Sequence, residues 1–183
     1  MESREAVAQA VGEIAQWSLE NFKEQEGDGL RLGRVAPLLG IFEEIYEYLR
    51  ADCQQEALDA LGDILIFMVD YLSRCGKSPE EIADMILCSD IDQLVSAPSN
   101  KCMPFIKCLS LARHELKRVQ GIRGYADATF YATMRDASIR DLINIVRVLL
   151  QSCSPFELDD ALLLVWNRVK HRNWRANPEN GSA

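Results

Sequence analysis

The sequence lacks the features of secreted and membrane-spanning proteins. No apolar run approaches the roughly 20 residues that a transmembrane helix needs. The first residues include Glu2, Glu5 and Glu13, where a secretory signal peptide would be basic and then apolar. These absences predict a cytoplasmic protein that does not bind a membrane.

Zinc-like and disulfide patterns are also missing. The six cysteines, at positions 53, 75, 88, 102, 108 and 153, form no CxxC pair. The only two histidines, His114 and His171, show no zinc-ligand spacing with a cysteine. We therefore expect the cysteines to be free, buried side chains in a reducing compartment.

Acidic and basic residues are divided unequally along the chain. Residues 96–183 hold 13 of the 20 Lys and Arg but only 8 of the 28 Asp and Glu, which makes this half about +5 and residues 1–95 about −13. The division predicts an acidic half, 1–95, that holds cations. The other half, 96–183, has a basic C-terminal tail that meets phosphates or the acidic half itself.

Strand alternation bounded by turn signals is absent, and apolar residues recur instead at helical spacing. The pattern predicts an all-α protein. Helices are expected over 4–23, from Ala36 or Pro37 to a break at 51–55, from that break to about Arg74, over 104–119 and over 138–152. Residues 121–131 are expected to form a loop, and 89–100 a linker between the halves.

Two Ser-Pro pairs mark helix starts. Ser78 is the expected N-cap of a short helix that ends near Cys88. Ser154 and Pro155 are expected to lead a last helix, ending near His171, with acids in its first turns at 157, 159 and 160.

Residues 38–72 carry the strongest functional signal. Two predicted helices each present three carboxylates at helical spacing: Glu43, Glu44 and Glu47 on the first, and Glu56, Asp59 and Asp63 on the second. Such spacing usually means a solvated acidic face.

Two details favour a different interpretation of these acids. Asp63 and Asp70 border the apolar run 64–69, and Arg50 and Arg74, at the helix ends, are the only basic residues on these helices. A buried carboxylate needs a cation, a hydrogen-bond donor or a proton. Mg²⁺ is the ion that best combines carboxylate oxygens with water and phosphate oxygens.

This stretch resembles the MazG-type all-α nucleoside triphosphate pyrophosphohydrolases, which include dimeric dUTPases and relatives of phosphoribosyl-ATP pyrophosphohydrolase. The family motif is EExxE followed by ExxD, and it is similar to EEIYE at 43–47 and LDALGDIL at 58–65. Trp17, Asn21 and Phe22 are similar to the family's first helix, and NRVKHRNW at 167–174 to its tail. The resemblance implies a MazG-like helical bundle, Mg²⁺ or Mn²⁺ as cofactor, and a homodimer or homotetramer. It also implies hydrolysis of a nucleoside triphosphate to monophosphate and pyrophosphate in nucleotide house-cleaning.

Ala60 departs from the motif, because it stands where the family has the Glu of ExxD. Either Glu56 or Asp59 replaces that ligand, and the sequence does not choose between them. Our hypothesis makes Glu44, Glu47, Asp59 and Asp63 metal ligands, with Glu56 as a further candidate. Glu43, Glu44 or Glu56 would orient or deprotonate a metal-activated water.

Lys170, Arg172, Asn173 and Trp174 match the family tail and are predicted to contact substrate. The alternative is a helix C-terminus where cations simply complement the dipole. Nucleic acid is not an expected partner, because the chain as a whole is acidic.

The second half contains an echo of the first. Residues 141–153 are similar to 63–75, and His114, Glu115 and Arg118 fall where the acids 43, 44 and 47 would lie. Two explanations are open: the bundle consists of two tandem repeats, of which the second is degenerate, or the two apolar helices are alike by chance. Because Ala60 removes a ligand, a non-catalytic bundle that binds nucleotide or protein is the alternative to an enzyme. A general helical interaction module remains if all the acids are solvated.

Overall fold

The computed structural model describes residues 2–22, 33–87, 103–121, 128–173 and 176. These residues form seven helices and no strand, which confirms the all-α prediction. The helices are α1 (Glu2–Phe22), α2 (Ala36–Arg50), α3 (Gln54–Arg74), α4 (Pro79–Leu87), α5 (Met103–Val119), α6 (Ala128–Cys153) and α7 (Leu158–Val169). Within the described ranges, no helix is both long and apolar enough to cross a bilayer. The predicted linker at 89–100 lies outside the described residues.

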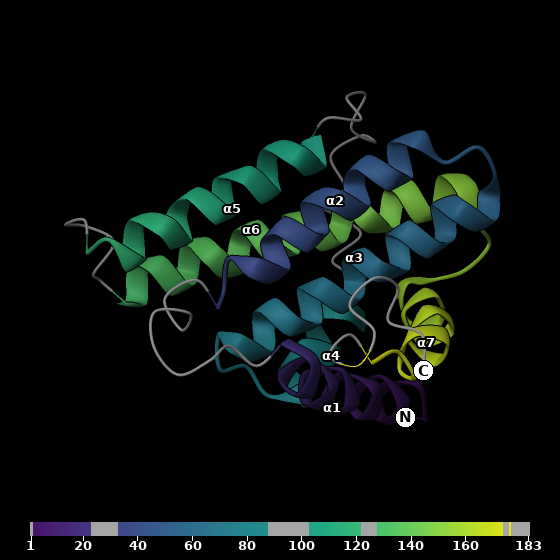
Figure 1. The fold of residues 1–183 in the computed structure, drawn as a ribbon, viewed down its shortest axis with the longest axis horizontal. Helices are drawn as coiled ribbons and strands as arrows, with labels where there is room; N and C mark the ends of the chain where they lie inside the picture. The colour runs from purple at the N-terminus through teal and green to yellow at the C-terminus, as the bar shows by residue number, and fades with distance from the viewer. Residues whose placement is uncertain (1, 23–32, 88–102, 122–127, 174–175, 177–183) are drawn as a thin grey trace.

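Four of the helices form a bundle, and α3 connects that bundle to the other three. α2 and α6 each pack against both α3 and α5, so these four helices close a ring. The remaining helices, α1, α4 and α7, all contact α3 and lie together at the lower side of the molecule in Figure 1. Each half of the chain thus supplies two helices to one bundle.

α3 is buried along most of its length because other helices surround it. Its apolar run 64–69 is buried, as predicted, except for the half-buried Phe67. A Cβ atom at Gly62 would lie 2.2 Å from Val165 Cγ2, and one at Gly40 would lie 2.5 Å from Phe67 Cε1. Glycine at these positions therefore lets α7 and α2 approach α3 closely.

α2 follows its predicted apolar stripe only in part. Leu38, Ile41 and Ile45 are buried, but Phe42 and Leu49 are each 39 % exposed. The buried face is narrower than predicted because α2 packs against α3 and α5 and leaves its outer side open.

One of the two Ser-Pro starts was predicted correctly. Ser78 Oγ accepts a hydrogen bond from the Glu81 N–H (3.2 Å), and Glu81 Oε2 accepts one from the Ser78 N–H (2.8 Å), which is a capping box at the start of α4. The other start was placed too early, since α7 begins at Leu158 with Glu157 as its N-cap residue. Ser154 Oγ instead accepts a bond from the backbone N–H two residues later (3.2 Å), and this local turn delays the helix.

The start of α6 was also predicted wrongly. α6 begins at Ala128, well before Ser138, and takes in the end of the expected loop at 121–131. Tyr131 and Arg135 are 5 % and 8 % exposed. Packing of these two side chains in the interior stabilises helical turns that the apolar pattern alone did not indicate.

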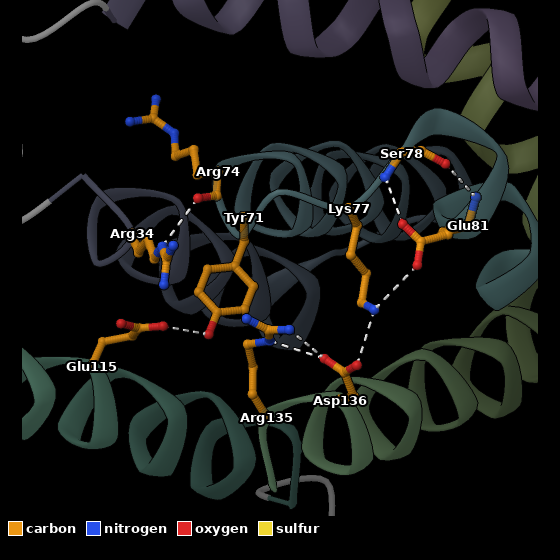
Figure 2. A network of polar contacts seen from close by, with 9 residues as sticks. All are labelled: Arg34, Tyr71, Arg74, Lys77, Ser78, Glu81, Glu115, Arg135 and Asp136. Atoms are coloured by element: carbon orange, nitrogen blue, oxygen red, sulfur yellow. Dashed lines mark hydrogen bonds and ion pairs between the residues drawn. The ribbon is translucent and has the colours of Figure 1, made fainter. Parts of the chain in front are cut away.

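Polar contacts fix the end of α3 against α5 and α6 (Figure 2). The Tyr71 hydroxyl donates to Glu115 Oε1 (2.8 Å), and Lys77 Nζ lies 2.9 Å from Asp136 Oδ2. Arg135 also pairs with Asp136, at 2.8 Å. Ion pairs and a hydrogen bond within the protein therefore hold this end of the bundle together.

The described cysteines are free thiols, as predicted. Cys108 is buried, and Cys75 and Cys153 are partly buried. Cys53 is exposed, contrary to the prediction, because it is the N-cap residue of α3 at the break between two helices. Positions 88 and 102 lie outside the described residues.

Candidate functional site

A pocket of about 430 Å³ lies between the C-terminal half of α2 and the N-terminal half of α3. The short break between these helices turns the chain back on itself, so acids from both helices reach the same volume. Its lining residues are Tyr46, Glu47, Arg50, Ala51, Glu56, Asp59, Ala60 and Asp63. Four of them are predicted metal ligands, and the volume is in the range of small-molecule sites.

Glu44 lies in the least favourable environment for a charged carboxylate among these acids. It is half-buried, whereas Glu43 and Glu47 are exposed. Its Oε2 atom is buried without a hydrogen-bond partner. Burial, and then the charges of Asp63, Glu47 and Glu43, raise the pKa of Glu44 to about 8, although Arg172 opposes them. Without a further cation, Glu44 is therefore mostly protonated at pH 7.

Asp63 shares this electrostatic environment from the α3 side. Its burial raises its pKa to about 6, Arg172 and Arg168 lower the pKa in part, and Asp59 and Glu47 raise it. The α2 and α3 acids thus form one cluster whose negative charge the two arginines only partly neutralise.

Asp59 and Glu56 already have partners of their own. Arg168 from α7 binds Asp59 with both terminal nitrogens, with Nη1 2.9 Å from Oδ2. Gln55 Nε2 also donates to Asp59 Oδ1 (2.8 Å). Glu56 Oε2 accepts a bond from the Asp52 N–H (2.9 Å), so its carboxylate ties the break between α2 and α3 to the first turn of α3. The two acidic helices supply no basic partner for Asp59, but α7 does.

Two buried acids elsewhere show how this chain satisfies a carboxylate without a metal. Asp70 pairs with Arg74 one turn later (2.8 Å), so it does not need the outside cation that the sequence suggested. Glu115 is fully buried, but it accepts bonds from Tyr71 (2.8 Å; Figure 2) and from Arg118 Nε (2.9 Å). Burial alone would raise the pKa of Glu115, yet Tyr131, Arg118 and Tyr71 together outweigh burial and hold the pKa below its ordinary value.

A divalent cation fits the donor chemistry of the α2–α3 cluster. Glu44, Glu47 and Asp63 offer the hard carboxylate oxygens that Mg²⁺ and Mn²⁺ prefer, and the unpartnered Glu44 Oε2 is a free acceptor among them. Among the described residues, no three acid, histidine or cysteine side chains are already gathered into a ligand set. Binding an ion would therefore require these side chains to change rotamer.

Arg172 is the predicted substrate-binding residue that the structure brings to the acids. Its charge lowers the pKa values of both Glu44 and Asp63. Its backbone carbonyl accepts a bond from Trp17 Nε1 (2.9 Å), so α1 fixes the position of the chain that follows α7.

The other three predicted tail residues are not shown to reach the acids. Lys170 Nζ donates to Asn167 Oδ1 (2.8 Å). Asn173 Oδ1 accepts a local bond from the Ala176 N–H (3.0 Å). Trp174 lies outside the described residues.

Sequence reasoning missed two residues that line the pocket. Tyr46 and Arg50 line it, and Arg50 Nη1 donates to the Tyr46 hydroxyl (2.9 Å) with the guanidinium carbon 5.5 Å from the ring centre. Their spacing from Glu43 and Glu47 places them on the same helix face, so this signal was readable. Arg168 belongs to the basic C-terminal tail that the sequence predicts to meet phosphates, but its pairing with Asp59 had no local signal, because α7 meets α3 only in the folded chain.

The fold and the pocket together define a protein class, a helical bundle with an acidic pocket at one end of a helix pair. Comparisons with protein-family models, curated proteins and solved structures found no match to this chain.

Proposed function

We propose that the protein is a Mg²⁺-dependent nucleoside triphosphate pyrophosphohydrolase of the MazG type, acting in nucleotide house-cleaning. It would convert an NTP or dNTP and water to the monophosphate and pyrophosphate. The observation that carries the proposal is Glu44, a half-buried acid with an unpartnered oxygen beside Glu47 and Asp63. Buried acids elsewhere in the described chain find protein donors, so this one is the best candidate for a metal ligand.

Each residue of the cluster has a role in this reaction. Glu44, Glu47 and Asp63 would hold the cation, which when bound activates water and neutralises phosphate charge. Glu43, exposed on the same helix, would orient the water or accept its proton. Arg172 would bind phosphate oxygens, because it already lies close enough to the acids to change their pKa values.

Tyr46 and Arg50 form the part of the pocket wall that is not acidic. The Tyr46 ring is 53 % exposed and is held by Arg50. An aromatic face of this kind suits stacking with a nucleobase, and we assign it to the base or sugar of the substrate.

A second candidate function has specific support in Ala60 and Asp59. Ala60 lines the pocket without offering a carboxylate, and Asp59 is paired with Arg168. A bundle with fewer ligands would bind nucleotide or a protein partner without turnover, because less charge would be neutralised during attack on phosphorus.

Pyrophosphate release from a panel of NTPs and dNTPs, with Mg²⁺ or Mn²⁺, separates the two functions. The enzyme proposal expects turnover by the parent and a loss of at least about 100-fold in Glu47→Gln and Asp63→Asn proteins. Glu5→Gln, an exposed acid on α1, is the matched control. Equal rates in all four proteins would refute the site, and binding without any release would support the non-catalytic alternative.

An apolar face on α2 and α5 supports self-association. Leu39, Phe42, Ile106 and Leu109 are between 39 % and 62 % exposed on two helices that pack side by side. Contiguous exposed apolar surface commonly marks an interface, so we assign this face to a second copy in a homodimer or homotetramer. Light scattering should show an oligomer for the parent and a smaller species for Leu109→Glu; a monomeric parent would contradict the assignment.

A further inference from the structure

The Arg168–Asp59 pair is an unusual feature of the acidic pocket. Asp59 lines the pocket from α3, whereas Arg168 comes from α7, which packs against α3 from outside the four-helix bundle. The guanidinium binds both carboxylate oxygens. The two side chains are 43 % and 37 % exposed, so the pair is open to solvent and can separate without disturbing the core.

The pair occupies a carboxylate that a cation would use. While Arg168 holds both oxygens of Asp59, that carboxylate is a poor metal ligand, because its lone pairs and its charge are already engaged. Asp59 would keep its hydrogen bond from Gln55 (2.8 Å) if the arginine moved away. Arg168 would then be a fork-shaped donor at the rim of the pocket, a group well suited to phosphate oxygens.

Arg172 shows no comparable side-chain ion pair among the contacts described, and its hydrogen bonds are made by its backbone. The Trp17 indole fixes its carbonyl, and its own N–H donates to Val169 O (2.8 Å). Arg168 is instead held at its charged end by Asp59 alone among the contacts described, and its long side chain can turn about the end of α7.

We propose that Arg168 is an internal counter-ion that holds Asp59 until a divalent cation and a phosphate chain enter the pocket, and that it then binds the phosphate oxygens. This inference rests on the proposed function, because it needs a metal site in the α2–α3 cluster. It makes Arg168 a residue that opposes binding of the metal alone and favours binding of the metal together with phosphates.

The opposite signs of these two effects make the inference testable without turnover. Mn²⁺ alone, and then inorganic pyrophosphate at saturating Mn²⁺, would be titrated by calorimetry into the parent, Arg168→Gln and Arg168→Lys. Arg113→Gln is the matched control, because Arg113 is an exposed arginine on α5 close in sequence to Glu115, which packs against the far end of α3. Thermal unfolding would confirm that all four proteins are folded.

Arg168→Gln should bind Mn²⁺ about two- to fivefold more tightly than the parent, since an exposed ion pair no longer competes. It should bind pyrophosphate about tenfold more weakly, since a bidentate charged contact is lost. Arg168→Lys should fall between the two in both titrations. If the parent binds Mn²⁺ but Arg168→Gln matches Arg113→Gln in either titration, the inference is wrong and the metal site stands. If the parent binds no Mn²⁺ at millimolar concentration, the proposed function fails together with the inference.

Discussion

Replacing Glu44 by Gln should change how the stability of the metal-free protein depends on pH. The folded-state pKa of Glu44 is about 8, against an ordinary value of 4.5. Below pH 4.5 the group is protonated in both the folded and the unfolded state. Between 4.5 and 8 the unfolded chain releases the proton while the folded protein keeps it, so the free energy of unfolding falls as pH rises. Gln carries no charge and removes this loss.

The size of the effect follows from the pKa difference. A difference of one in pKa corresponds to about 1.4 kcal/mol, so the full range from 4.5 to about 8 sets an upper limit of about 5 kcal/mol. Glu44 is only half-buried, and solvent screening reduces this to about 2 kcal/mol. For a chain of this size, about 2 kcal/mol corresponds to a Tm difference of roughly 4–8 °C.

Thermal unfolding between pH 6.5 and 8.5 isolates Glu44, because Asp63, with a pKa of about 6, has completed most of its change below that range. The parent should lose stability across this range in the absence of metal, and Glu44→Gln should lose less. Added Mg²⁺ should raise the Tm of the parent at pH 8 and should raise that of the variant little. Glu5→Gln should follow the parent throughout. Parallel curves for parent and Glu44→Gln would refute the account of this acid.

Three further substitutions test the fold and the site. Gly62→Ala places a Cβ against Val165 and should lower the free energy of unfolding by about 1–2 kcal/mol in denaturant unfolding. Gly12→Ala, with nothing within 4 Å, should leave the free energy of unfolding unchanged or raise it. A change of the same sign in both variants would contradict the packing. Glu115→Gln should lower the free energy of unfolding by about 3 kcal/mol, because it breaks a buried network. It should leave the Mg²⁺-dependent rise in Tm intact, so loss of that rise would place the metal site elsewhere. Ala60→Glu should add a carboxylate to the pocket and tighten Mn²⁺ binding in calorimetry; unchanged or weaker binding would show that the pocket does not hold the ion.

The sequence predicted features that depend on neighbouring residues. The capping box at Ser78 and Glu81 and the buried run 64–69 follow from short-range spacing. The same spacing, together with the short break between α2 and α3, places Glu47, Glu56, Asp59 and Asp63 around one pocket. The Asp70–Arg74 pair was also readable as an i, i+4 contact, because Arg74 was one of the two basic residues that the sequence places on these helices.

Other features depended on packing between distant segments. α6 extends back to Ala128 because Tyr131 and Arg135 are buried among other helices, which local composition does not reveal. The partner of Asp59 comes from α7, so no local pattern could show that this ligand candidate is already paired. The position of Ala60 in the pocket wall, beside the acids, was also known only from the structure.

The position of water attack tests the central claim most directly. The parent would be incubated in ¹⁸O-enriched water with Mg²⁺ and the best nucleoside triphosphate of the panel, and the products analysed by mass spectrometry. Attack on the α-phosphorus predicts one ¹⁸O atom in the nucleoside monophosphate and none in the pyrophosphate, with no products from Asp63→Asn. Label in the pyrophosphate, release of orthophosphate in place of pyrophosphate, or full activity of Asp63→Asn would contradict the account.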